Sequence, residues 1–164
     1  MSSKILVALR IAAPPEVVFD AFTGDIALWW RPNTLFSFTP RSPGAMAFED
    51  GRLVERLASG KVFEVGKIRV WERGARLVFG WRQASFGPGM DTEVEVRFEP
   101  VDEGTRVTVE HRGWDSVPAE NVARHTFPNA VFLQRHGEWW RALLAGLASR
   151  ASSVQLRAAG EGDQ

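Results

Sequence analysis

Three side chains that can exchange protons are expected to point into the interior of the folded chain. His111 alternates in phase with the apolar residues of one predicted strand, and His136 lies on the apolar face of a predicted helix near the C-terminus. Glu55 shares the apolar side of another predicted strand. Two inward imidazoles could bind a metal ion or act as acid and base, and a buried carboxylate could also transfer protons. These residues are the candidates for catalysis.

A structural role is the more frequent one for such groups. Interior imidazoles are usually hydrogen-bonded by their surroundings, and an interior Glu usually pairs with an arginine, of which Arg41, Arg52 and Arg56 are near Glu55 in sequence. The chain has no Cys and no HExxH spacing, and it has no P-loop, dinucleotide fingerprint or Ser nucleophile elbow. We therefore expect no catalytic residue, with the three side chains above as the alternatives, and neither a metal nor a cofactor.

The aromatic composition indicates a different kind of site. The chain contains 11 Phe and 7 Trp but no Tyr, which is more large apolar rings than a compact core of this size needs. Either the core is aromatic throughout, or the rings line a cavity that holds a flat or aliphatic molecule by apolar burial. The residues predicted to contact such a ligand are Trp30, Phe36, Phe38, Phe48, Phe63, Phe79, Trp81, Val96, His111, His136, Trp139 and Trp140.

The elements that would position these residues follow from the hydrophobic pattern. Alternation predicts a strand over residues 5–11, and two short helices should follow, the first opened by Pro14-Pro15 and the second capped by Asp25. About six more strands are expected between residues 35 and 112, with a hairpin turn at Asp50-Gly51 and a bulge at Gly66-Lys67. Residues 113–128 are typical of an irregular linker. A long helix with a wide apolar sector should begin at residue 129 and reach residue 150 or beyond.

These elements predict an α+β fold of the helix-grip type. Alternating strands with one apolar face need a cover on that face, and the C-terminal helix is the only element large enough to supply it. We expect a curved antiparallel sheet of about 6–7 strands wrapped around that helix, with two short helices after the first strand. The length of 164 residues fits one domain, predicted over residues 1–157, and the Gly- and acid-rich residues 158–164 are expected to form a disordered tail.

Charge and hydropathy restrict the partners. Basic and acidic residues number 20 each, so the chain lacks the positive excess typical of nucleic-acid binding. No apolar run approaches the roughly 18 residues of a membrane span, and the N-terminal residues have no signal-peptide pattern. We expect a cytoplasmic protein that binds neither nucleic acid nor membranes, with a homodimer left open.

Several segments resemble one protein family. Residues 13–30 (APPEVVFDAFTGDIALWW) are similar to an opening helix pair that ends in Trp-Trp, residues 66–81 (GKIRVWERGARLVFGW) to a strand pair, and residues 139–147 (WWRALLAGL) to a closing helix. Their order resembles the START-like superfamily, also called SRPBCC or Bet v 1-like, in the branch homologous to the C-terminal domain of the heat shock protein 90 ATPase activator. If Trp140 is the closing Trp of the family, Trp139 replaces a small Gly and would reduce or reshape the cavity.

The resemblance implies a shared fold and cavity but no shared catalytic set. The superfamily includes lipid carriers, hormone receptors, polyketide cyclases and antibiotic self-resistance proteins, so the fold does not determine the function. We predict non-catalytic binding of a small hydrophobic ligand, such as a lipid, between the sheet and the C-terminal helix. One alternative is a co-chaperone-like domain that stimulates a heat shock protein 90-type ATPase. Another is an enzyme similar to polyketide cyclases and hydrolases that uses the same cavity.

Overall fold

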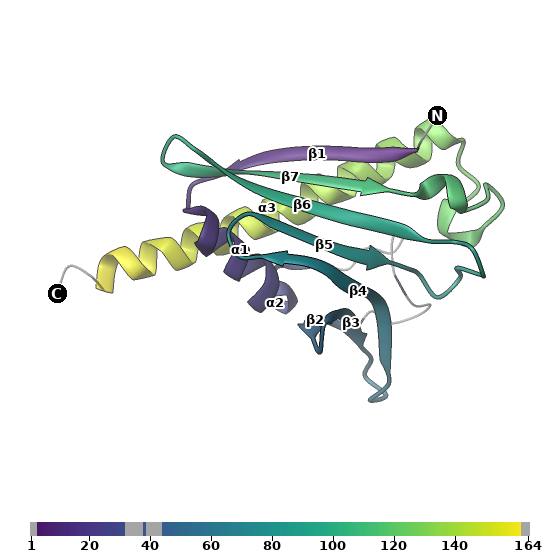
Figure 1. Ribbon diagram of the computed structural model, residues 1–164, viewed down its shortest axis with the longest axis horizontal. Coiled ribbons are helices and arrows are strands. Elements are labelled where there is room, and N and C mark those ends of the chain that lie inside the picture. Colours follow the sequence, from purple (N-terminus) through teal and green to yellow (C-terminus); the bar gives the residue numbers. More distant parts are fainter. Residues whose placement is uncertain (1–2, 32–37, 39–43, 162–164) are drawn as a thin grey trace.

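The computed structural model describes residues 3–31, residue 38 and residues 44–161, and in this part of the chain seven antiparallel strands form one sheet. The strand order is β1-β7-β6-β5-β4-β3-β2, and helix α3 lies across one face of the sheet (Figure 1). The predicted helix-grip fold is confirmed. The elements are β1 (Lys4–Ile11), α1 (Pro15–Gly24), α2 (Ile26–Trp29), β2 (Ala45–Glu49), β3 (Arg52–Arg56), β4 (Val62–Glu72), β5 (Arg76–Trp81), β6 (Thr92–Val101), β7 (Gly104–Arg112), the 3-10 helices η1 (Trp114–Ser116) and η2 (Val122–Arg124), and α3 (Asn129–Glu161).

The sheet bends where two irregularities interrupt β4. Val65 is the extra residue opposite β3, and Arg69 is the extra residue opposite β5, so the two bulges flank the predicted position at Gly66-Lys67. The backbones of β4 and β5 approach closely here: a Cβ on Gly66 would lie 1.9 Å from the carbonyl oxygen of Gly80. Only glycine fits at this contact. The two bulges and this close approach bend the sheet towards α3.

The predicted hairpin turn at Asp50-Gly51 is confirmed, whereas the predicted helix cap at Asp25 is not. The β2–β3 hairpin turns through Asp50 and Gly51, both with positive φ, as the sequence predicts. Asp25 stands at the N-cap of α2 but makes no capping hydrogen bond. Its carboxylate instead accepts a hydrogen bond from Nε of Arg150 at 3.0 Å, so the predicted cap is wrong and an ion pair to α3 replaces it.

Helix α3 supplies the cover that the apolar face of the sheet requires. Its buried side chains include Phe132, Trp140, Leu144 and Leu147, and a Cβ on Gly146 would lie 2.9 Å from the carbonyl oxygen of Trp29. The helix continues through residues 158–161, within the segment expected to be a tail, and the domain boundary at residue 157 stays a prediction. None of the helices in the described ranges combines the length and apolar character that a bilayer-spanning segment needs.

Candidate functional site

The polar residues of the interior gather at one end of the sheet. Trp81 ends β5, Thr92 begins β6 and His111 lies near the end of β7. Antiparallel pairing brings them together, because Trp81 lies opposite Thr92 and Val94 lies opposite His111. Helix α3 passes over the same place and contributes Trp140.

A directed chain of hydrogen bonds holds His111. The indole Nε1 of Trp140 lies 3.2 Å from Nδ1 of His111, and an indole N–H can only donate. Nδ1 is therefore the acceptor, so the neutral ring carries its proton on Nε2 and donates it to Oγ1 of Thr92 at 3.0 Å. The Thr92 hydroxyl donates in turn to the carbonyl oxygen of Trp81 at 2.7 Å. Both nitrogens of His111 are engaged by the protein.

His111 is held in its uncharged form. Complete burial lowers the pKa of His111 well below its usual range, and the nearby imidazole of His136 lowers it further. Protonation would also place an N–H on Nδ1 directly against the N–H of Trp140. The ring is therefore a poor acid or base, and the geometry favours the structural role over the catalytic one.

His136 approaches His111 from the helix side. The two ring centroids are 5.1 Å apart, and the rings of Trp114, Phe132 and Trp139 lie 5.1 to 5.5 Å from that of His136. Burial lowers the pKa of His136 to about 3, with a further contribution from His125. The sequence thus predicted a meeting of two imidazoles that the structure contains, while their contact with a ligand stays a prediction.

Glu55 lies elsewhere in the sheet. Its side chain is buried and faces inward, as expected, but β3 is four strands away from β7 in the sheet order. The backbone N–H of Gly44 donates to its carboxylate at 3.4 Å. Two of the arginines considered as its partners bind other carboxylates, since Arg52 pairs with Glu64 and Arg56 with Glu49.

The three candidates for proton transfer therefore form no single catalytic set. Arg41, the remaining arginine considered for Glu55, falls outside the described residues. Within the described part of the chain, no three His, Asp or Glu side chains gather closely enough to hold a metal ion.

Five aromatic rings form a continuous cluster between the sheet and α3, which we call the inner cluster. Phe38 lies 4.5 Å from Trp81, and the centroids of Trp30, Trp139 and Trp140 lie 5.6 to 5.8 Å from that of Trp81. Trp30 and Trp139 retain 8% and 5% of their accessible surface, whereas Trp81 and Trp140 retain 1% and 0%. All five rings are therefore buried, and Trp30 and Trp139 keep slightly more accessible surface than Trp81 and Trp140.

The other predicted contact residues lie outside the inner cluster. Phe79 packs on Phe48 at 5.4 Å, in a second aromatic group that includes Phe22 of α1. Val96 is fully buried on β6, and Phe63 is half-buried on β4. The prediction for Phe36 falls outside the described residues.

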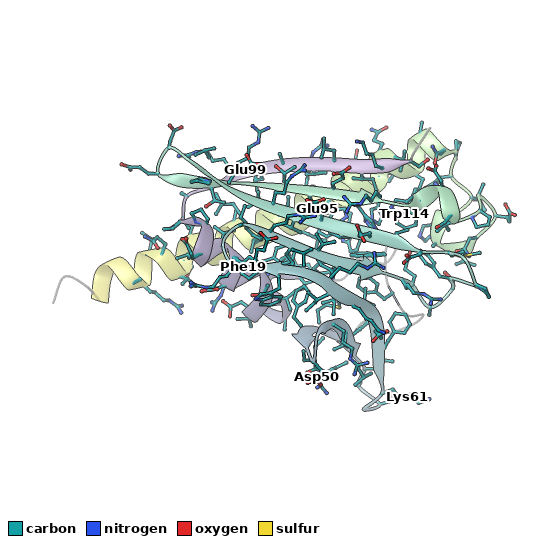
Figure 2. The ribbon with its side chains drawn as sticks, viewed as in Figure 1. Phe19, Asp50, Lys61, Glu95, Glu99 and Trp114 are labelled. Carbon is teal, nitrogen blue, oxygen red and sulfur yellow. The ribbon has the colours of Figure 1, made fainter. Side chains whose placement is uncertain are left out.

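Residues 113–128, expected to be an irregular linker, contribute Trp114, which packs against His111 and His136. The ring of Trp114 lies 5.1 Å from the ring of His111, and Trp114 is fully buried where the chain leaves β7 (Figure 2). Arg124 is only 6% exposed and donates to the carbonyl oxygens of Trp114 and Val117 at 2.8 and 3.2 Å. It also donates to Asn129 at 2.8 Å.

Arg124 and Thr92 are absent from the predicted site. An Arg in a polar, irregular segment has the composition of a solvated loop, so the sequence carries no signal that Arg124 is buried. Thr92 could have been found from the pairing of β6 with β5 and β7, because it follows from the position of His111 once the register is known.

Two indole N–H groups lie buried beside His111 and His136. Nε1 of Trp81 and Nε1 of Trp114 are buried and have no hydrogen-bond partner among the described residues. Both indoles flank the imidazole pair, with centroids 4.8 and 5.1 Å from that of His111. The described interior therefore contains two donors for which no described residue supplies an acceptor.

Comparison with known proteins agrees with this architecture. The family model described as Activator of Hsp90 ATPase homolog 1-like protein matches residues 12–151. Protein MLL2253 from Mesorhizobium loti has a similar structure with a TM-score of 0.61 and 17% identity, covering 92% of this chain and 97% of that one. None of the curated proteins compared with the chain matches it.

Two further solved structures have the same fold. CalU16 from Micromonospora echinospora has a TM-score of 0.56 and 22% identity, covering 98% of this chain and 83% of that one. PFC0360w, an HSP90 activator from Plasmodium falciparum, has a TM-score of 0.57 and 20% identity, covering 88% and 93%. At these identities the likeness shows the fold alone.

Proposed function

The chain belongs to the family of Activator of Hsp90 ATPase homolog 1-like proteins, and within that family we propose that it binds a small hydrophobic molecule between the sheet and α3 without catalysing a reaction. The observation that carries this proposal is the inner cluster. Its rings run without interruption from Trp30 and Trp139, which are buried but keep a small accessible area, to Trp81, which is almost completely buried. A ligand entering there would exchange contacts among rings for contacts with its own apolar surface.

Trp30 and Trp139 are the rings that such a ligand would meet first. They lie edge to face, with centroids 5.7 Å apart and planes at 86°, and both keep part of their surface accessible. Each large ring buries roughly 150–250 Å² on full contact, and apolar burial stabilises by about 25 cal/mol per Å². If a ligand displaces one of these rings, the free energy lost with the contacts of the ring is similar in size to the free energy gained by burying the ligand. The affinity should therefore be sensitive to substitution of Trp30 or Trp139.

The hydrogen bonding of the imidazoles supports binding rather than the enzymatic alternative. Both nitrogens of His111 bond to protein groups, and burial keeps the pKa of His136 near 3. Glu55 lies four strands away from His111 in the sheet order. Neither imidazole has the near-neutral pKa that suits a general acid or base, because burial lowers both values.

One observation favours the co-chaperone-like alternative. Trp71 on β4 is 49% exposed, and its ring is held edge-on by Phe19 of α1 at 5.2 Å. A large, rigidly supported and half-exposed Trp is a frequent anchor of protein–protein interfaces. A structure of the same fold, PFC0360w, is an HSP90 activator, which keeps this alternative as the second candidate.

A crossed pair of variants separates the two functions. We expect the neutral fluorescent probe N-phenyl-1-naphthylamine to bind the intact protein saturably, and Trp30→Leu to change its dissociation constant by about tenfold, since one wall of the site is replaced. The matched control Trp71→Leu should leave probe binding unchanged, because Trp71 lies outside the inner cluster.

The opposite outcome identifies the second candidate. If the protein accelerates ATP hydrolysis by a heat shock protein 90-type ATPase, and Trp71→Leu abolishes that effect while Trp30→Leu does not, the co-chaperone-like function is supported. Absence of saturable probe binding in the wild-type protein would contradict the proposed function directly.

A further inference from the structure

The unused indole donors restrict the chemistry of the ligand. Trp81 and Trp114 are 1% and 0% exposed, and an indole offers one N–H donor and no acceptor. Burying a donor without a partner costs the hydration that it loses, so a matching acceptor stabilises the complex more than an additional apolar contact does. Such an acceptor must be brought to these two N–H groups from outside the described interior.

The polar groups around the two donors are already committed. Nδ1 of His111 accepts from Trp140, and the Thr92 hydroxyl accepts from His111. The carbonyl oxygen of Trp81 accepts from Thr92. In the described structure neither indole N–H donates to any of these groups.

The surroundings also disfavour charge. Burial keeps both imidazoles uncharged, with the pKa of His136 lowered to about 3. The guanidinium of Arg124 lies 5.8 Å from the centroid of Trp114 and donates to two backbone carbonyl oxygens and to Asn129. An anionic group placed beside the imidazoles would lose its hydration without gaining a dedicated ion pair.

We propose that the ligand of this site is a neutral apolar molecule that carries a carbonyl oxygen, and that this oxygen accepts a hydrogen bond from the indole N–H of Trp81 or of Trp114. This inference rests on the proposed binding function and adds the chemical class of the ligand. A neutral carbonyl presents an acceptor and no donor, which is the complement of the two indoles. A carboxylate adds an unpaired charge, and a hydrocarbon leaves both donors unused.

Three naphthalenes of closely similar shape test the proposal on the intact protein. They are 2-acetylnaphthalene, which has the carbonyl, 2-isopropenylnaphthalene, which has a CH₂ group in place of the oxygen, and 2-naphthoate, which is charged. Quenching of tryptophan fluorescence gives the three dissociation constants. We expect the ketone to bind at least about tenfold more tightly than the other two, the effect of one good hydrogen bond.

Removal of each N–H identifies the donor. Trp81→Phe or Trp114→Phe keeps an aromatic ring but deletes the indole N–H, and at least one of them should reduce the preference for the ketone over the alkene to about twofold or less. Trp71→Phe is the matched control and should preserve the preference. If a variant fails to fold, the wild-type protein labelled with ¹⁵N decides the question. The indole N–H resonance of Trp81 or Trp114 should then shift downfield with the ketone and not with the alkene.

The other possible results contradict the carbonyl group, the neutral charge or the binding of a hydrophobic ligand. Equal affinities for ketone and alkene, with no indole shift, would reject the carbonyl class while leaving hydrophobic binding intact. Tightest binding of 2-naphthoate would reject the neutral class. If none of the three probes binds, the proposed function itself fails.

Discussion

The two faces of the sheet treat charge in opposite ways, and adjacent residues of one strand illustrate it. His111 points inward, where burial without a counter-charge lowers its pKa well below the usual range. Arg112 points outward and bonds to Glu93, Glu95 and Glu110, and the hydrogen bond to Glu95 contributes most to raising its pKa. At this position the inner face keeps the imidazole uncharged, whereas the outer face pairs the guanidinium with carboxylates.

The outer face is a network of alternating charges across neighbouring strands. Glu95 lies in the middle of β6 (Figure 2). Its carboxylate accepts from Arg76 and from Arg112 at 2.8 Å each. The hydrogen bond from Arg112 is the largest cause of the lowered pKa of Glu95. Such pairs near solvent contribute little each, because water and salt screen them. From this contrast between the two faces we expect the free energy of unfolding to depend mainly on the inner face, with small contributions from the ion pairs of the outer face.

Acid should affect the inner face most strongly. His111 and His136 have folded-state pKa values below the unfolded value of roughly 6.5, so the unfolded chain binds more protons as the pH falls from about 6.5 towards the folded-state values. Full stability is present above about pH 6.5 and is lost below it. Between pH 7 and pH 4.5 we expect the free energy of unfolding to fall by up to about 5 kcal/mol for the two imidazoles together.

Urea unfolding at several pH values measures this loss. His136→Phe should remove roughly half of the pH dependence, because one of the two titrating imidazoles is gone. His125→Gln, which changes the half-buried histidine outside the imidazole pair, is the control and should retain most of it. Acid sensitivity that is identical in the His136→Phe protein would show that other groups cause it.

Truncation on the inner face should have the next largest effect. Trp140→Ala removes a fully buried ring and the donor to His111, and we expect a loss of about 3–5 kcal/mol in the free energy of unfolding. Arg112→Ala deletes the centre of the outer network, and we expect a loss of no more than about 1 kcal/mol. Chemical denaturation of both variants measures the two losses in the free energy of unfolding. Equal losses would contradict the larger contribution assigned to the inner face.

The smallest effect should come from one carboxylate of the outer face. Glu95→Gln keeps the shape of the side chain but removes its charge, and its NH₂ group replaces one of the two oxygens that accept from Arg76 and Arg112. We expect a loss of about 0.5 kcal/mol at low ionic strength, and a smaller loss in roughly 0.5 M NaCl, where screening is stronger. A loss that does not depend on salt would indicate that packing, and not charge, is responsible.

Local patterns in the sequence predicted most of the fold. In β6 the apolar residues Val94 and Val96 alternate with Glu93 and Glu95, which identifies the strand and both of its faces, and the structure places them so. The Asp50-Gly51 turn is equally local, because two residues with positive φ suffice to form it. The prediction failed at Asp25, whose carboxylate accepts a hydrogen bond from Arg150, 125 residues away, and makes no capping hydrogen bond to α2.

The sequence by itself determined which residues face inward, because alternation and helical spacing assign side chains to the faces of strands and helices. That pattern alone puts His111 and His136 in the same inward-facing layer. Only the tertiary structure decided what they do there. The bond from Trp140 to His111 and the bond from His111 to Thr92 depend on the strand register and on the position of α3, and no local pattern encodes either. The burial of Arg124 and the unused donors of Trp81 and Trp114 arise in the same way, since contacts between distant segments are decided by the packing of the whole chain.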